Sequence, residues 1–225
     1  TDVIYIIQPF QLGNKRLDSI NSKQYISANN QGGTTYIRWG RTTCPNDTAA
    51  ELVYEGYAAG SHHTHAGGGA NYVCLPRDPL FEDDITGGSR SLMYGAEYEI
   101  PSGVLNSLHD HDVPCAVCRT PRTNVLMIPG RNQCYNDWKL EYHGFLMSDY
   151  YGHASSKEYA CMDSDPESLN SGTTNDNGAL FYLVEGRCGS LKCPPYIEDG
   201  KLHALFVHTV EEHVVHLEIN DHVKT

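Results

Sequence analysis

The stretch Tyr36-Ile-Arg-Trp-Gly-Arg-Thr-Thr-Cys44-Pro45 and the later stretch His62-His-Thr-His65-Ala-Gly-Gly-Gly-Ala-Asn-Tyr-Val-Cys74-Leu-Pro76 carry the strongest fold information in this chain. Each joins a cysteine to β-branched or aromatic residues and to the turn formers Gly and Pro. This composition is typical of short strands and loops that end at disulfides. The second stretch also places three histidines beside Gly67–Gly69, which indicates either a metal site or a crowded turn.

Outside these stretches, short apolar runs lie between clusters of Gly, Pro, Asn and Ser, and helical periodicity is weak. The runs are Leu52–Tyr54, Asn124–Ile128, Gly178–Val184 and Ala204–Val207. Such a pattern predicts an all-β fold, a disulfide-stapled sandwich or barrel-like domain with long loops. We find no internal repeat of fixed period and no low-complexity tract.

The same pattern divides the chain into three segments. Residues 1–32 contain a predicted strand, Val3–Ile7, and a polar linker; residues 33–209 form the cysteine-bearing body; residues 210–225 contain a second predicted strand, Val214–Ile219. Apolar and polar residues alternate in the last strand, as in a half-buried strand. The two terminal strands are expected to pair within the chain or between subunits of a homo-oligomer.

Bulk composition excludes several functional classes. The chain has 225 residues, 40% of them hydrophobic and 20% charged, which is typical of a globular protein. Its formal net charge of -12 argues against nucleic acid and anionic membranes as partners, and permits calcium, basic proteins or neutral sugars. No apolar run reaches the roughly 18 residues of a transmembrane helix. Since the chain begins at Thr1, we interpret it as a mature form that has lost a signal peptide.

Cysteine usage predicts an extracellular, secreted protein. An even number of cysteines, most of them widely spaced, favours a disulfide framework formed in an oxidising compartment over a zinc site. The framework is expected to comprise Cys44, Cys74, Cys134, Cys161, Cys188 and Cys193. The sequon Asn46-Asp-Thr48 predicts N-glycosylation at Asn46, in agreement with secretion.

A series of landmarks links the body to a known extracellular family. They are Gly33-Thr-Thr-Tyr-Ile-Arg-Trp-Gly-Arg, Leu52-Val-Tyr-Glu-Gly, Gly68-Gly-Ala-Asn-Tyr-Val-Cys-Leu-Pro, Tyr94-Gly-Ala-Glu-Tyr-Glu, Val113-Pro-Cys-Ala-Val-Cys, Met127-Ile-Pro-Gly-Arg-Asn-Gln-Cys, Gly144-Phe-Leu-Met-Ser, Asn177-Gly-Ala-Leu-Phe-Tyr and Val184-Glu-Gly-Arg-Cys-Gly. In these landmarks, residues 33–209 resemble the noncollagenous C-terminal domain of sponge short-chain (spongin-type) collagens, which also occurs without collagen repeats in secreted invertebrate proteins. The resemblance implies an extracellular matrix setting. The chain has no Gly-x-y triplets and is not itself a collagen.

One departure from the family pattern concerns Cys115 and Cys118. Members of the family carry a second Cys-x-x-Cys near the end of the domain, where this chain has Ala204 and Val207. The resemblance therefore predicts that Cys115 and Cys118 have lost their partners. Either packing replaces the missing disulfides, or the two cysteines act as free thiols, as metal ligands, as links between subunits or as attachment points for a small molecule or chromophore.

The histidines suggest a metal site. His62, His65 and His153, together with His111, offer imidazoles that suit zinc or copper, whereas the alternative is that they hydrogen-bond backbone in a tight loop. The carboxylates of Asp83-Asp84 and Asp163-Ser-Asp165-Pro-Glu167 give a weak calcium signal, because the EF-hand glycine and glutamate are missing. Further histidines crowd the C-terminal part of the chain and predict sensitivity to pH near 6. They are His203, His208, His213, His216 and His222.

No catalytic motif is present: the chain lacks a Gly-x-Ser-x-Gly elbow, a His-Glu-x-x-His pair and a phosphate-binding loop. The sequence therefore predicts a secreted, non-enzymatic recognition or matrix and adhesion module that binds a glycan, a matrix component or its own copies. The alternatives are a secreted zinc- or copper-binding protein or enzyme built on the histidines, and a small-molecule carrier that uses Cys115 or Cys118.

Overall fold

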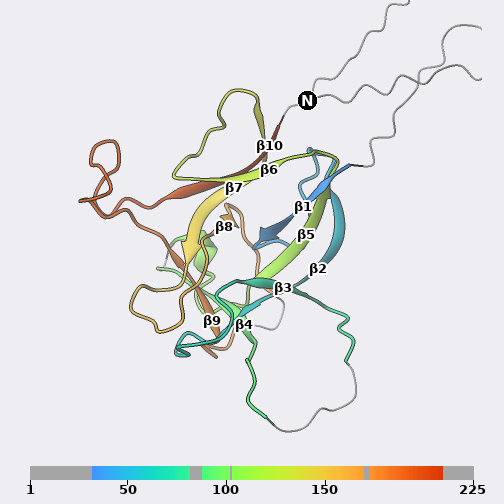
Figure 1. Cartoon of the computed structure of the whole chain (residues 1–225), viewed down its shortest axis with the longest axis vertical. Coiled ribbons are helices and arrows are strands. Elements are labelled where there is room, and N and C mark those ends of the chain that lie inside the picture. The colour runs from blue at the N-terminus through green and yellow to red at the C-terminus, as the bar shows by residue number, and fades with distance from the viewer. Residues whose placement is uncertain (1–31, 82–87, 102, 170–172, 210–225) are drawn as a thin grey trace, which may run out of the picture. The chain divides into compact units, whose positions relative to one another are not determined.

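The computed structural model describes residues 32–81, 88–101, 103–169 and 173–209, and this part of the chain is all-β (Figure 1). One sheet contains the ten strands, and the only helical turn in the described ranges is η1, Leu105–Ser107. The strands are β1 Thr34–Trp39, β2 Glu51–Gly60, β3 Val73–Pro76, β4 Tyr94–Glu99, β5 Pro114–Thr120, β6 Val125–Pro129, β7 Trp138–Ser148, β8 Ala160–Asp163, β9 Ala179–Leu183 and β10 His203–Thr209. The structure confirms the predicted all-β, disulfide-stapled fold, and it is consistent with a sandwich-like domain. No helix of the described residues is long and apolar enough to cross a membrane. Both predicted terminal strands lie outside these ranges.

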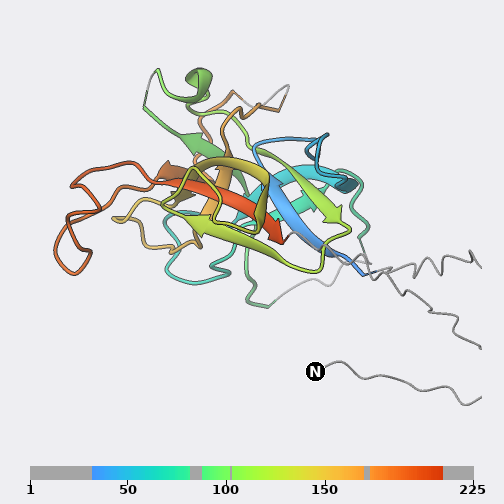
Figure 2. The ribbon, with the colours of Figure 1, turned by 90° about the horizontal axis from the view of Figure 1, so that it is seen from above.

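The sheet consists of two halves with the same pairing pattern, residues 33–120 (the N-half) and 124–209 (the C-half). In the N-half, β5 pairs with β1 and β2, and β2 pairs with β3 and β4. In the C-half, β10 pairs with β6 and β7, and β7 pairs with β8 and β9. Figure 2 shows β10 (red) beside β6 (yellow-green), the arrangement that β5 and β1 have in the other half.

The sequence has no repeat of fixed period, but the two halves still share matching residues. Matching residues occur in both halves: Gly-Arg-x-x-Cys-x-Asn-Asp at 40–47 and 130–137, Leu-x-Tyr-x-Gly at 52–56 and 140–144, Tyr-x-Cys at 72–74 and 159–161, and Gly-Ala at 95–96 and 178–179. The segments between these matches differ in length, so no fixed period links them. Both halves also have a register shift at the same place. In the N-half it lies between Leu52 and Tyr54 of β2, and in the C-half it lies in β7, opposite Phe206 and Val207 of β10.

A pair of equivalent glycines shows how closely the halves agree. A Cβ atom on Gly56 would lie 1.7 Å from the carbonyl oxygen of Leu75, and one on Gly144 would lie 1.8 Å from that of Met162. In each half, the long strand (β2 or β7) and its short partner (β3 or β8) thus approach too closely for any side chain.

The halves are joined by two parallel pairings. β4 and β9 lie side by side with equivalent residues opposite each other, Ala96 facing Ala179 and Tyr98 facing Phe181, and β1 meets β8 at Trp39. Because β7 pairs with both β8 and β9, the path of paired strands returns to β7. Tyr98, Phe181 and other core side chains from both halves are fully buried in the principal core. The core therefore belongs to the two halves together.

The disulfides correct the sequence prediction about Cys115 and Cys118. Cys118 is bonded to Cys44 and Cys115 to Cys74, and both β5 cysteines are fully buried, so neither is a free thiol or an attachment point. A third disulfide joins Cys188 to Cys193 in the connection between β9 and β10.

Cys134 and Cys161, which were expected to belong to the framework, are the free cysteines of the described residues. They are the C-half equivalents of Cys44 and Cys74. Their partner positions on β10 hold Val207 and Ala204. Cys161 shares a hydrophobic cluster with Ala204, and Cys134 packs against the cluster that contains Val207. At these two places the C-half has packed apolar side chains where the N-half has disulfides.

Candidate functional site

A groove of about 1160 Å³ lies next to the joined ends of β4 and β9. The N-half contributes the end of β4 and the connection to β5, and the C-half contributes the β7–β8 loop, the end of β9 and the segment after it. The lining side chains that matter for its chemistry are Glu99, His109, Asp149, Tyr150, Tyr151, Tyr159, Tyr182, Glu185, Arg187 and Lys201. The groove is therefore rich in tyrosines and carboxylates, and both halves are needed to form it.

Asp149, directly after β7, is the most buried carboxylate of the groove, with only 3% of its side chain exposed. Its Oδ1 accepts hydrogen bonds from His153 Nδ1 at 2.7 Å and from the backbone N–H of Tyr150 at 2.8 Å. Because a carboxylate only accepts, the Nδ1 of His153 carries the proton. Oδ2 has no hydrogen-bond partner and lies 3.8 Å from Lys157 Nζ. Asp149 thus holds the start of the β7–β8 loop, with Lys157 as its charged neighbour.

Lys157 lies behind Asp149 and ties the halves together. Its buried Nζ donates to Ser61 Oγ of the N-half at 2.9 Å and to Ser155 Oγ of the C-half. Ser61 Oγ is also 2.9 Å from the carbonyl oxygen of Gly69. Burial lowers the pKa of Lys157, and the charge of Asp149 opposes that shift. Since both serines are buried as well, this network is a structural crosslink and offers no accessible nucleophile.

His62 and His65, two of the predicted metal ligands, stack on each other, and the ring of His63 lies close to those of His62 and His153. The ring centroids of His62 and His63 are 4.5 Å apart, those of His62 and His65 5.1 Å, and those of His63 and His153 4.6 Å. Burial, followed by the charges of His63 and His65, lowers the pKa of His62. This arrangement resembles the crowded turn that was the alternative to a metal site.

Several histidines of this region use the Nδ1 atom of the ring in contacts within the loops. His62 Nδ1 accepts from the backbone N–H of Thr64, and His63 Nδ1 lies 2.9 Å from the carbonyl oxygen of Asn177. His111, in the β4–β5 connection, places its Nδ1 2.9 Å from the carbonyl oxygen of His109. The four predicted ligands His62, His65, His153 and His111 do not form one three-ligand group in the part of the chain that the structure describes.

A different trio is close enough to share an ion. One ligand atom each from Glu99, His109 and Asp110 lie within 4.8 Å of one another, and Glu99 and His109 line the groove. Burial raises the pKa of Glu99. Burial, together with the charges of Glu99 and Asp149, raises the pKa of Tyr182 to about 12. Sequence reasoning named His111 in this connection but missed Glu99, because an isolated glutamate in a strand carries no motif.

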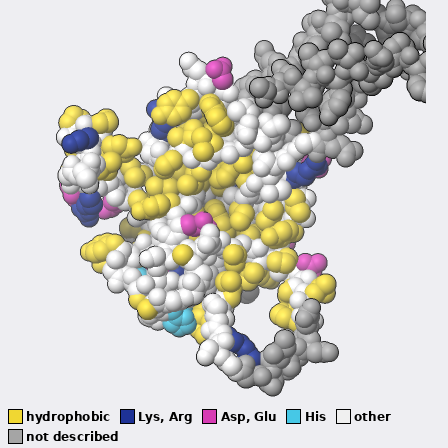
Figure 3. Space-filling model, in the orientation of Figure 1, with side chains coloured by type: hydrophobic (Ala, Val, Ile, Leu, Met, Phe, Trp, Pro, Cys, Tyr) yellow, Lys and Arg dark blue, Asp and Glu magenta, His cyan; other side chains and the backbone are white. Residues whose placement is uncertain are grey.

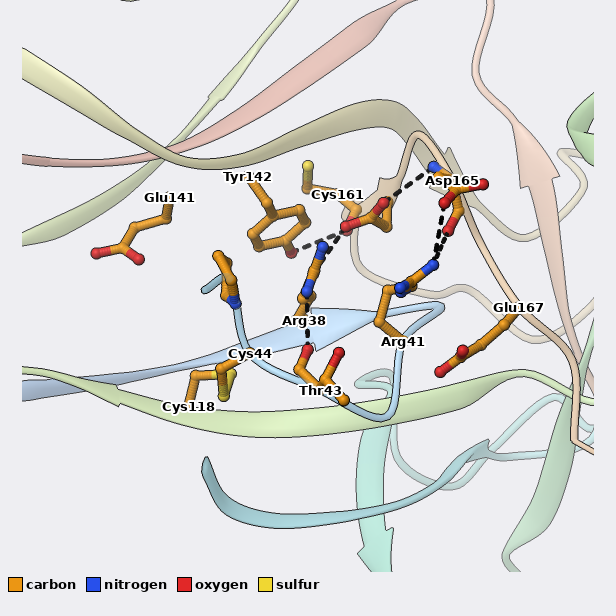
Figure 4. Close-up of polar contacts among 12 residues, drawn as sticks. Arg38, Arg41, Thr43, Cys44, Cys118, Glu141, Tyr142, Cys161, Asp165 and Glu167 are labelled. Atoms are coloured by element: carbon orange, nitrogen blue, oxygen red, sulfur yellow. Dashed lines mark hydrogen bonds and ion pairs between the residues drawn. A yellow bond between two sulfur atoms is a disulfide. The ribbon is translucent and has the colours of Figure 1, made fainter. Parts of the chain in front are cut away.

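The carboxylates proposed for calcium are bound to protein groups instead (Figure 4). Asp163 forms an ion pair with Arg38 at 2.7 Å, and Asp165 is 3.1 Å from Arg41. Glu167 accepts from the backbone N–H and hydroxyl of Thr42. These carboxylates hold the β1–β2 connection against the segment after β8. Asp83-Asp84 lies outside the described residues, and Asn46 is exposed in a turn, as a glycosylation site requires.

A second surface is apolar. The equivalent residues Leu52 and Leu140 are both exposed, as are Val53 and Leu126. Figure 3 shows hydrophobic side chains spread over much of one face of the molecule. The predicted homo-oligomer would need such a surface, and it stays a prediction.

Comparison with known proteins identifies no family: no protein-family model matches the chain, and no curated protein matches it significantly. The resemblance to spongin-type C-terminal domains therefore stays a prediction as well.

Proposed function

We propose that this protein is an extracellular recognition module whose groove binds a glycan without turnover. The observation that carries the proposal is the group of four tyrosines that lines the groove beside the carboxylates of Glu99 and Asp149. Sugar hydroxyls donate well to carboxylates, and the C–H faces of a sugar ring pack on aromatic rings. Tyr151 is 90% exposed, and Tyr150 and Tyr159 are also open to solvent, so aromatic surface is available for such packing.

The charges of the groove favour a neutral or amino sugar over a sulfated one. Arg187, one of the two cations that line the groove, is already paired with Glu185, Glu198 and Asp199. Glu99 and Asp149 add negative charge, and the whole chain carries a formal net charge of -12. A sulfated or phosphorylated ligand would therefore meet repulsion that a neutral or cationic ligand avoids.

The setting of the protein supports an extracellular ligand. Its three disulfides are compatible with an oxidising compartment, and Asn46 of the predicted sequon is exposed. The resemblance to spongin-type domains adds a matrix context in which glycans are common ligands. Secretion and matrix association are parts of this proposal.

The test is glycan-array screening followed by calorimetry with Tyr151→Ala, since this exposed ring can be removed without opening the core. We expect the unmodified chain to bind a neutral or amino-sugar glycan. Tyr151→Ala should weaken this binding at least about tenfold, equal to 1.4 kcal/mol. Asp149→Asn should weaken it as well. Tyr135→Ala is the matched control, because Tyr135 is exposed outside the groove and lies under Arg131. Absence of any glycan ligand, or equal losses for Tyr151→Ala and Tyr135→Ala, would overturn the proposal.

A further inference from the structure

The wall of the groove formed by the N-half brings together a histidine and two carboxylates. Glu99 ends β4, whereas His109 and Asp110 follow η1 in the connection to β5. The backbone fixes this turn, because the N–H groups of Asp110 and Leu108 donate to the carbonyl oxygens of Tyr98 and Leu105. The ligand atoms of the three side chains therefore approach within 4.8 Å of one another without any rearrangement of strands.

These three side chains are close but not hydrogen-bonded to each other. His109 Nδ1 lies 3.5 Å from Glu99 Oε2, and His109 Nε2 lies 3.6 Å from Asp110 Oδ1, both longer than a normal hydrogen bond. Asp110 Oδ1 is buried and has no hydrogen-bond partner. The side chain of Glu99 is only 11% exposed. Two shielded carboxylates thus face one imidazole, and their negative charge is only weakly compensated.

The spacing suits a small cation. With metal–ligand bonds of about 2.1 Å, two ligand atoms on a tetrahedral zinc ion are about 3.4 Å apart. The separation of His109 Nδ1 and Glu99 Oε2, 3.5 Å, is close to that value. One carboxylate oxygen of Asp110 lies within 4.8 Å of the ligand atoms of both other side chains. An ion there would also neutralise the two carboxylates.

We propose that Glu99, His109 and Asp110 bind one zinc ion on the wall of the groove. The mixed set of one imidazole and two carboxylates favours zinc over calcium, which takes oxygen ligands only and needs six or more. Three protein ligands leave the fourth position open, as in zinc sites that bind water or a ligand oxygen. Because His109 is 51% exposed and lines the groove, this position is accessible from the groove.

This proposal does not rest on the glycan. It differs from the zinc or copper site predicted from the sequence, since it uses none of His62, His65, His153 and His111. The alternative to a bound metal ion is a proton, because a protonated His109 would interact with both Glu99 and Asp110.

The experiment is a titration of the full, metal-stripped chain with Zn²⁺ against a fluorescent zinc indicator, with no sugar present. The same titration with Co²⁺ reports coordination geometry through its visible absorption. We expect one saturable site that His109→Gln weakens at least about tenfold, or 1.4 kcal/mol. Glu99→Gln should weaken the site similarly.

The matched control is His111→Gln, because His111 lies two residues away and hydrogen-bonds backbone. It should keep the site, as should the double variant His62→Gln/His65→Gln. Absence of a saturable site in the unmodified chain overturns the proposal, as does a site that survives His109→Gln. Loss of the site in His111→Gln or in the double variant would place the metal elsewhere and would also overturn it. Since no sugar is present, failure here leaves the glycan proposal to its own test.

Discussion

β5 and β10 occupy equivalent positions in the two halves, but they are held in different ways. Both are central strands with one partner on each side and the same register. β5 is bonded through Cys115 and Cys118 to two other segments, whereas β10 has Ala204 and Val207 at those places and relies on packing. The difference shows that strand pairing and a shared core are sufficient to define this arrangement, and that the disulfides add stability to it.

The largest expected effect comes from making β5 resemble β10. Cys74→Ala/Cys115→Ala removes a disulfide between residues 41 apart in sequence, so the denatured state regains the entropy of that loop. We expect the free energy of unfolding to fall by about 4 kcal/mol, measured by urea denaturation. Cys188→Ala/Cys193→Ala is the control: it opens a loop with a sequence separation of only 5 and should cost about half as much. Equal losses for the two variants would contradict this account.

The next prediction tests whether the long and short strands, β2 with β3 and β7 with β8, lie equally close together in the two halves. Gly56→Ala and Gly144→Ala would each push a Cβ into the backbone of the neighbouring short strand. We expect each to lower the free energy of unfolding by about 3 kcal/mol, and by similar amounts in both halves. Gly95→Ala is the control, because its Cβ would meet no atom within 4 Å. If only one of the two strand glycines were sensitive, the halves would be less alike than their registers indicate.

The reverse change makes β10 resemble β5. In β5, Cys115 faces Gly56 and bonds to Cys74, which faces Ala58; in β10, Ala204 faces Gly144, and Cys161 faces Leu146. Because these registers match, Ala204→Cys should form a disulfide with Cys161. We expect a gain of about 2 kcal/mol, since engineered disulfides deliver less than the loop entropy suggests.

Intact mass without reduction checks this bond, because a disulfide removes two hydrogen atoms. Ala204→Cys combined with Cys161→Ser is the control and should keep the mass expected for an unbonded thiol. A free thiol at position 204 in the single variant would show that the two halves differ in backbone geometry at this point.

The smallest expected effect concerns the parallel pair β4–β9, where Glu97 faces Leu180. Glu97 is only 2% exposed, and burial raises its pKa, with backbone N–H donors from Asp176 and Asn177 opposing the shift. The folded state therefore binds this proton more tightly than the unfolded state. The stability of the fold should rise as the pH falls from neutral through the folded-state pKa, and level off below the ordinary glutamate pKa.

Glu97→Gln should flatten that profile and raise stability at pH 7, as measured by thermal denaturation between pH 4 and pH 8 in steps of about one unit. Asp78→Asn is the control, because Asp78 lies exposed at the surface and should leave the profile unchanged. A profile for Glu97→Gln that keeps the slope of the unmodified chain would show that other carboxylates produce the pH dependence.

Sequence reasoning predicted the strands better than their partners. The all-β class follows from local composition at positions such as Leu52–Tyr54 and Ala204–Val207. The connectivity of eight cysteines does not, because 105 pairings are compatible with the same sequence. Matching the landmark around Cys44 to the one around Cys134 would have revealed the two halves and shown which cysteines lack partners. Unequal loops hide that match from any search for a fixed period.

The candidate site was harder to predict for a physical reason. Asp149 and Glu99 are single carboxylates that are 50 residues apart in number, and they meet on one groove because β9 pairs with both β4 and β7. Histidine-rich stretches such as His62–His65 are conspicuous in sequence, but their rings stack on one another. Proximity between distant strands, which no local pattern encodes, decides where the chemistry of this protein lies.

The β4–β9 pairing also bears on how such a chain could arise. Equivalent residues facing each other across two parallel strands, Ala96 against Ala179 and Tyr98 against Phe181, are what a two-fold symmetric dimer of identical subunits produces. A duplicated gene that fuses two such subunits frees each copy from having to match the other. Opposite Glu97 and Glu99 the second copy has Leu180 and Tyr182. The two halves therefore differ at the strand pair that joins them, with carboxylates on one strand and an apolar and an aromatic side chain on the other.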